Sequence, residues 1–160
     1  MIKVGDKVPS VKIKLAGEAG AGEEIAADAF FAGKKVVLFA LPGAFTPTCS
    51  AKHLPGFVEQ ADALKAKGVD VIACLSVNDA WVMGAWGREQ KAFPKIAMLA
   101  DGSAALTKAL GLELDLNAAN MGVRSKRYAA VVEDGVFRSL EIEEPGKFEV
   151  SSAEAVLGKL

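Results

Sequence analysis

The strongest constraint on the fold is an apolar run at residues 36–41 that leads into a Pro/Gly-containing loop and then a helical pattern. A nearly continuous apolar strand is typical of the centre of a sheet that is covered on both faces. Residues 69–77 form a second run of this kind. Helical patterns at 49–67, 79–90 and 104–110 alternate with the apolar runs. This alternation predicts an α/β fold, a mixed central sheet with helices on both faces.

The remaining segments predict the edges of this sheet. Residues 11–15 alternate as a half-buried strand does, and a glycine-rich loop follows. Residues 128–132 and 136–142 predict a hairpin because Asp134-Gly135 is a strong turn signal. Residues 111–122 are expected to form a loop, and a capping pattern at 151–154 predicts a last helix ending near residue 160. Asn78 is the expected cap of the helix at 79–90, and Pro55 predicts a distortion within the helix at 49–67.

Composition excludes several classes of protein. The 160 residues fit one domain, expected to span 1–160, and 51% of them are hydrophobic, so the chain can fill a core. With 19 basic and 20 acidic residues there is no electrostatic case for nucleic acid or an anionic membrane as partner. No apolar run is long enough to span a bilayer and no leader pattern is present, so we expect a cytoplasmic protein.

Cys49 is the residue on which the question of function depends. Thr46 suits an N-cap and Pro47 the first helical position, so Cys49 falls in the first turn of a helix. There the free backbone N–H groups and the helix dipole favour a thiolate over a thiol. The alternative is an ordinary buried cysteine, but a first turn behind a Pro/Gly loop tends to be polar and accessible.

The other candidate site residues have plain structural alternatives. Cys74 lies in a central-strand pattern and is expected to be an inert core thiol, with a secondary redox role as the alternative. His53, the only histidine, lies four residues after Cys49, so it either supports the loop or forms a thiol-hydrolase pair with Cys49. With so few cysteine and histidine residues, we expect no metal site.

The residues around Cys49 suggest further roles. Thr46 is close enough in sequence to bring its hydroxyl to the sulfur, and Pro42 makes a rigid wall that could shield it. A cation beside the sulfur would stabilise an anionic reaction centre. Arg124, Lys126 and Arg127 are the candidates, and the residues alone do not decide among them. No glycine pattern for nucleotide binding is present.

The spacing of Pro42, Thr46 and Cys49 resembles the Pro-x-x-x-Thr-x-x-Cys motif of peroxiredoxins, and further segments resemble their type II subfamily. These segments are PGAFTPTCS (42–50), HLPGF (53–57), CLSVND (74–79), LADGS (99–103) and FEVSSA (148–153). The resemblance covers essentially the whole chain. It implies a thioredoxin-like fold and reduction of hydrogen peroxide and organic hydroperoxides by thiols, without a cofactor.

The resemblance also assigns roles to residues. It implies Cys49 as the peroxidatic cysteine, Thr46 and Pro42 as its active-site partners, and Arg124 as the arginine that faces the thiolate. Backbone N–H groups near Gly43 and Cys49 would bind the peroxide.

The resemblance further implies the partners. The C-terminal region has no second cysteine, so we expect an external thiol to regenerate Cys49: glutathione with glutaredoxin, or thioredoxin as the alternative. Such proteins commonly form homodimers, and Phe45, Trp81 and Trp86 are candidate contacts. A non-enzymatic redox sensor that signals through oxidised Cys49 is the competing interpretation.

Overall fold

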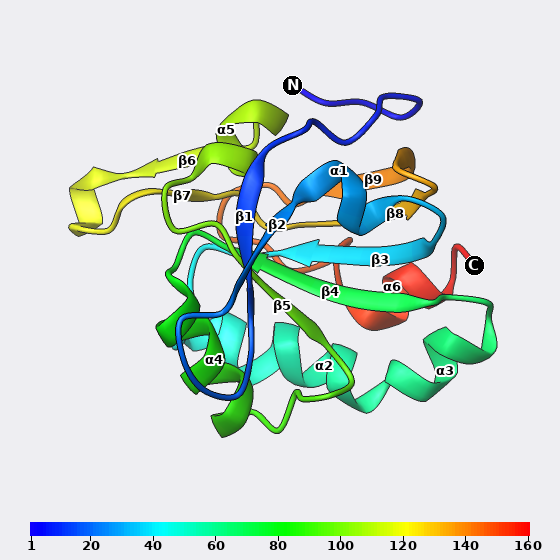
Figure 1. Ribbon diagram of the computed structural model, residues 1–160, viewed down its shortest axis with the longest axis horizontal. Coiled ribbons are helices and arrows are strands. Elements are labelled where there is room, and N and C mark those ends of the chain that lie inside the picture. The colour runs from blue at the N-terminus through cyan, green and yellow to red at the C-terminus, as the bar shows by residue number, and fades with distance from the viewer.

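A seven-stranded mixed sheet forms the centre of the protein in the computed structural model, which describes all residues 1–160 (Figure 1). The strand order is β2-β1-β5-β4-β3-β8-β9, with β3, β4 and β5 parallel and the other pairings antiparallel. The strands are β1 (Lys12–Ala16), β2 (Glu23–Ala26), β3 (Lys35–Ala40), β4 (Val71–Ser76), β5 (Ala97–Ala100), β8 (Tyr128–Glu133) and β9 (Val136–Ile142). The predicted fold class, a thioredoxin-like mixed sheet with helices on both faces, is confirmed.

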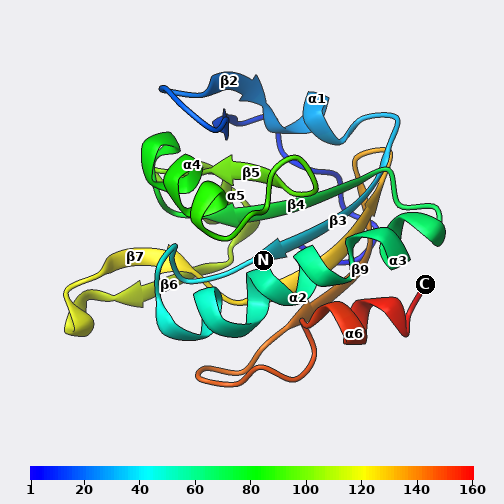
Figure 2. The same cartoon turned by 90° about the horizontal axis from the view of Figure 1, so that it is seen from below.

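Two separate hydrophobic clusters cover the two faces of the sheet, because alternate residues of each buried strand point to opposite sides. One cluster includes residues of α2, α3, α4 and α6, and the other includes residues of α1 and α5. Figure 2 shows α2, α3 and α6 together on one side of the sheet and α1 on the other. These helices are α1 (Ala27–Phe31), α2 (Leu54–Glu59), α3 (Ala61–Ala66), α4 (Ala80–Glu89), α5 (Ala105–Leu110) and α6 (Ala153–Leu157).

Several local predictions are wrong in detail. Part of the expected loop at 111–122 is a strand, β6 (Glu113–Leu116), which pairs with β7 (Gly122–Ser125) in a two-stranded sheet linked by a 3₁₀ turn, Asn117–Ala119. The apolar/polar alternation of residues 112–116 is consistent with this strand, and its partner β7 begins only at Gly122, where the expected loop ends. Asp79 rather than Asn78 caps α4, because its side chain accepts a hydrogen bond from the Val82 N–H at 2.8 Å.

The carboxyl ends of β3, β4 and β5 meet at one edge of the sheet. Functional sites of such sheets form at this edge. The Asn78 side chain, just beyond β4, accepts a 3.0 Å hydrogen bond from the Ala44 N–H of the loop after β3. Ser76 donates to the same Asn78 oxygen at 2.6 Å. The end of β4 therefore holds the loop that leads to Cys49.

Candidate functional site

Cys49 begins a π-helical turn, Cys49–His53, inserted between the first helical residues at 47–48 and α2. The predicted distortion near Pro55 is confirmed, and it is this π-helical turn. Proline has no N–H and its ring crowds the preceding turn, so a regular α-helix cannot continue through it. The wider π turn absorbs the change, and the Leu54 N–H bonds to the Cys49 carbonyl five residues earlier.

Arg127, and not Arg124, is the cation at the sulfur. The Arg127 Nη2 atom donates to Cys49 Sγ at 3.2 Å, and the sulfur is fully buried. Arg124 instead donates from Nη1 to the Pro42 carbonyl at 3.3 Å and from Nε to the Met121 carbonyl at 2.9 Å. The expectation that Arg124 faces the thiolate is therefore wrong; Arg124 braces the loop that carries the motif.

The alternation of residues along β8 explains why Arg127 is the one that reaches the sulfur. Tyr128 packs in the cluster with α1 and α5, whereas Ala129 packs in the cluster that contains Cys49. By this alternation Arg127, one residue before Tyr128, lies on the same face as Ala129. The register Ala40↔Tyr128 also places it where β3 ends. The parity can be read from the sequence, but the face of the sheet on which Cys49 packs cannot, so the residues alone did not decide among the arginines.

His53 is buried and contacts Arg127 rather than the sulfur. Arg127 Nη1 lies 2.8 Å from His53 Nδ1, and His53 Nε2 lies 2.9 Å from the Ser151 carbonyl oxygen. Burial, and next the charge of Arg127, lower the pKa of His53 to about 3, so the ring is neutral. Since Ser151 offers only an acceptor, Nε2 carries the proton and Nδ1 accepts from Arg127. The structure favours the supporting role over a hydrolase pair.

Thr46 and Gly43 shape the loop on the other side of Cys49. The Thr46 hydroxyl donates to the Gly43 carbonyl at 2.7 Å. Its oxygen accepts no hydrogen bond from a backbone N–H of the helix, so the expected side-chain cap is absent and its lone pairs stay available. A Cβ on Gly43 would lie 2.7 Å from Arg124 Nη1 and 3.2 Å from Thr46 Cγ2, so only glycine fits here without a shift. The Gly43 N–H makes no hydrogen bond within the protein.

Cys74 is fully buried in β4, opposite Phe39 of β3, in the same hydrophobic cluster as Cys49. Burial, and next the neighbouring Cys49, raise the pKa of the Cys74 thiol well above its usual value. Both cysteines are free. A thiol held protonated in a central strand is a poor nucleophile.

A cavity of about 540 Å³ opens beside the site. Pro42, Thr48, Lys126, Arg127 and Phe148 are among the residues that line it. The cavity therefore reaches Arg127, which contacts the sulfur, whereas Cys49 itself is not part of the lining.

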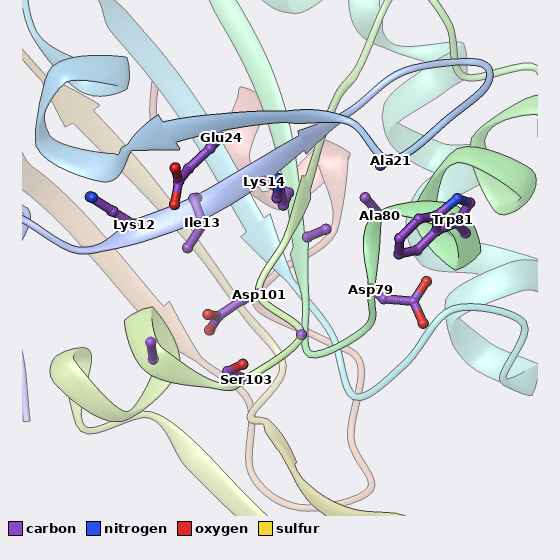
Figure 3. A pocket seen from close by; sticks show the side chains of 13 residues that line it. Lys12, Ile13, Lys14, Ala21, Glu24, Asp79, Ala80, Trp81, Asp101 and Ser103 are labelled. Atoms are coloured by element: carbon purple, nitrogen blue, oxygen red, sulfur yellow. The ribbon is translucent and has the colours of Figure 1, made fainter.

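A second cavity, of about 290 Å³, contains neither cysteine. Lys12 and Lys14 of β1 line one part of it, and Asp79 and Trp81 at the start of α4 line another (Figure 3). Trp81 is 63% exposed, and Phe45 of the Cys49 loop is 53% exposed with a positive φ of 64°. Trp86, in contrast, is fully buried and donates from Nε1 to the Ser50 hydroxyl at 3.0 Å, so it is unsuited to an intermolecular contact.

The structure shows neither a candidate metal site nor a helix suited to cross a membrane. No cluster of three His, Cys, Asp or Glu side chains is placed to hold a metal ion. None of the helices combines the length and the apolar character needed to cross a bilayer.

A family model, related sequences and solved structures all identify the same family for this chain. The Redoxin family matches residues 3–157. Peroxiredoxin-2B of Arabidopsis thaliana is 48% identical over 159 residues, which cover 99% of this chain and 98% of that protein. The chloroplastic Peroxiredoxin-2E of the same plant is 49% identical over 162 residues, covering 99% of this chain and 69% of that protein.

Solved structures agree over the full length. The crystal structure of reduced Prx3 from Vibrio vulnificus in complex with H₂O₂ superposes with a TM-score of 0.94 and 52% identity, covering 100% of both chains. A Burkholderia cenocepacia protein described as a putative thioredoxin reductase superposes with a TM-score of 0.97 and 52% identity, covering 100% of this chain and 98% of that one. With its Pro42, Thr46 and Cys49 spacing, the chain belongs to the redoxin family and, within it, to the type II peroxiredoxins.

Proposed function

We propose that this protein is a thiol peroxidase that reduces hydrogen peroxide and organic hydroperoxides at Cys49. The observation that carries the proposal is the 3.2 Å contact from Arg127 Nη2 to Cys49 Sγ in a fully buried site. A cation at hydrogen-bond distance stabilises negative charge on the sulfur, and the thiolate is the nucleophilic form of cysteine. The cavity lined by Pro42, Thr48 and Arg127 leads to the guanidinium that contacts the sulfur.

The first step is an in-line attack of the Cys49 thiolate on one peroxide oxygen. An S–O bond forms and the O–O bond breaks, and its electron pair leaves with the distal oxygen. That oxygen takes a proton and departs as water or an alcohol, while the sulfur is oxidised by two electrons to sulfenic acid. Arg127 stabilises the negative charge that spreads over the two oxygens.

Two polar groups of the loop are placed to orient the peroxide. The Gly43 N–H has no partner in the protein and is free to donate to a peroxide oxygen. The Thr46 hydroxyl already donates to the Gly43 carbonyl, so it acts towards the peroxide as an acceptor. Gly43 thus offers the peroxide a hydrogen-bond donor and Thr46 offers it an acceptor.

Regeneration uses an external thiol, with glutathione and glutaredoxin favoured over thioredoxin. The sulfenic acid condenses with one thiol, releasing water and forming a mixed disulfide, and a second thiol displaces it by exchange. What supports an external reductant is the buried, protonated state of Cys74, the only other cysteine. We further propose a homodimer with Phe45 and Trp81 at its contacts, acting where thiols are kept reduced, in the cytoplasm.

A steady-state assay with hydrogen peroxide tests the proposal. Cys49→Ser should abolish turnover, and Cys74→Ser, the matched control, should keep most of it. Turnover that persists in Cys49→Ser would overturn the assignment. Running the assay with glutathione and glutaredoxin, and separately with thioredoxin, identifies the reductant. A sensor would instead oxidise once with either system and stop.

A further inference from the structure

We propose that Glu143 is a positioning residue for the pair formed by Arg127 and Cys49, acting through Ser151 and His53. Glu143 lies just beyond β9, is only 7% exposed, and forms no ion pair. The proposal deepens the proposed function, because it assigns control of the Cys49 thiolate to a residue that does not touch the sulfur.

The first link is the shared guanidinium of Arg127. One terminal nitrogen, Nη2, reaches Cys49 Sγ, and the other, Nη1, reaches His53 Nδ1 at 2.8 Å. Because a guanidinium is planar and rigid, fixing Nη1 also fixes the direction in which Nη2 points. The position of His53 therefore sets how the cation meets the sulfur.

The second link is the tautomer of His53. Nδ1 can accept from Arg127 only if the ring proton is on Nε2. The Ser151 carbonyl oxygen, 2.9 Å from Nε2, accepts that proton and so selects this tautomer. If the Ser151 carbonyl were displaced, the ring proton could move to Nδ1. Nδ1 and Arg127 Nη1 would then both be donors, and the hydrogen bond between them would be lost.

The third link is the carboxylate of Glu143, which holds Ser151. Its Oε2 atom accepts from the backbone N–H groups of Glu149, Val150 and Ser151 at 2.8, 2.8 and 2.9 Å. It also accepts from the Ser151 hydroxyl at 2.7 Å. These residues lie outside any helix or strand, so no ladder of backbone hydrogen bonds holds them. Three successive amides that converge on one oxygen make Glu143 the main anchor of this segment.

Two more contacts tie the anchored segment to Arg127. The Phe148 ring centroid lies 5.8 Å from Arg127 Cζ and 5.0 Å from the His53 ring centroid. The Glu143 N–H also donates to the Arg127 carbonyl at 2.9 Å. Burial alone would raise the pKa of Glu143, but its hydrogen bonds with Ser151, Val150 and Glu149 together lower it, so the anchor is charged at neutral pH.

The test uses Glu143→Gln in a Cys74→Ser background, so that Cys49 is the only thiol. Glutamine keeps the size of the side chain but loses the charge that gathers three amides. The midpoint of the pH profile of iodoacetamide alkylation should move upward. Reaction with H₂O₂ should slow by up to about 100-fold, as small misplacements of reacting groups do.

Glu141→Gln is the matched control, because Glu141 lies on β9 two residues earlier and pairs with Lys159. It should leave both the midpoint and the rate unchanged. NMR of the ring nitrogens of His53, the only histidine, supplies a readout that does not depend on activity. Glu143→Gln should reduce the Nε2-protonated form.

A Glu143→Gln protein with an unchanged midpoint and an unchanged His53 tautomer would overturn the proposal, even if it is less stable. If that variant does not fold, Ser151→Ala, which removes one of the four hydrogen bonds, decides instead. It should shift the midpoint in the same direction by less, and no shift would overturn the proposal. Neither readout needs peroxide turnover, so a failure of the peroxidase assignment itself would be recognised separately.

Discussion

His53 should make the stability of this protein depend on pH in a window where few other groups titrate. The ring is fully buried, and burial followed by the charge of Arg127 lowers its pKa to about 3. In the unfolded chain the same ring takes up a proton near pH 6.5. Between these values the unfolded state binds more protons than the folded state. The contribution of His53 to the free energy of unfolding is therefore complete above pH 6.5 and decreases as the pH falls below it.

The size of the effect follows from these two pKa values. Lowering the pH from 7.5 to 5.0 should cost about 2 kcal/mol, since only the unfolded chain is protonated there. Glu143, whose pKa is lowered from a usual value of 4.5, adds its loss only at more acidic pH. Urea unfolding at pH 5.0, 6.0 and 7.5 measures the change.

The control variant for this prediction is His53→Gln, which keeps a donor and an acceptor but does not titrate. Its stability should change by much less than 2 kcal/mol over this pH range, whatever its stability at pH 7.5. Because the chain has a single histidine, no second imidazole can mask the difference. Equal losses in the two proteins would refute the conclusion that His53 is buried in its neutral form.

Two further outcomes follow from the site. Arg127→Gln should slow the reaction with H₂O₂ by about 100- to 1,000-fold, which is the usual cost of losing one aimed hydrogen-bond donor. Arg124→Gln should slow it far less, because the Arg124 guanidinium donates to the Pro42 carbonyl and not to the sulfur. Stopped-flow measurement compares the two rates, and a larger loss in Arg124→Gln would reverse the two roles. Trp81→Glu should lower the molecular mass in solution from that of two chains to that of one, because a charge replaces a 63% exposed indole. Sedimentation measures this mass, and an unaltered dimer would place the contact elsewhere.

Much of the fold was readable because its signals are local. The apolar runs predicted β3 and β4, and Asp134-Gly135 predicted the hairpin of β8 and β9, whose turn has positive φ at both residues. The segment at 111–122 was misread although residues 112–116 alternate apolar and polar, because the partner strand β7 begins only where that segment ends. A strand of four residues is hard to tell from a loop when its partner is not recognised.

For the site, the order of residues was enough to place Cys49 in the first turn of a helical segment behind a Pro/Gly loop, since the apolar run, Thr46 and Pro47 are neighbours along the chain. Which arginine meets the sulfur is set by tertiary contacts. That choice depends on the pairing of β8 with β3, which are far apart along the chain, and on which face residue 127 then occupies. The same holds for the anchor of Ser151 by Glu143. Such contacts arise from register and packing between distant segments, which no local pattern of residues encodes.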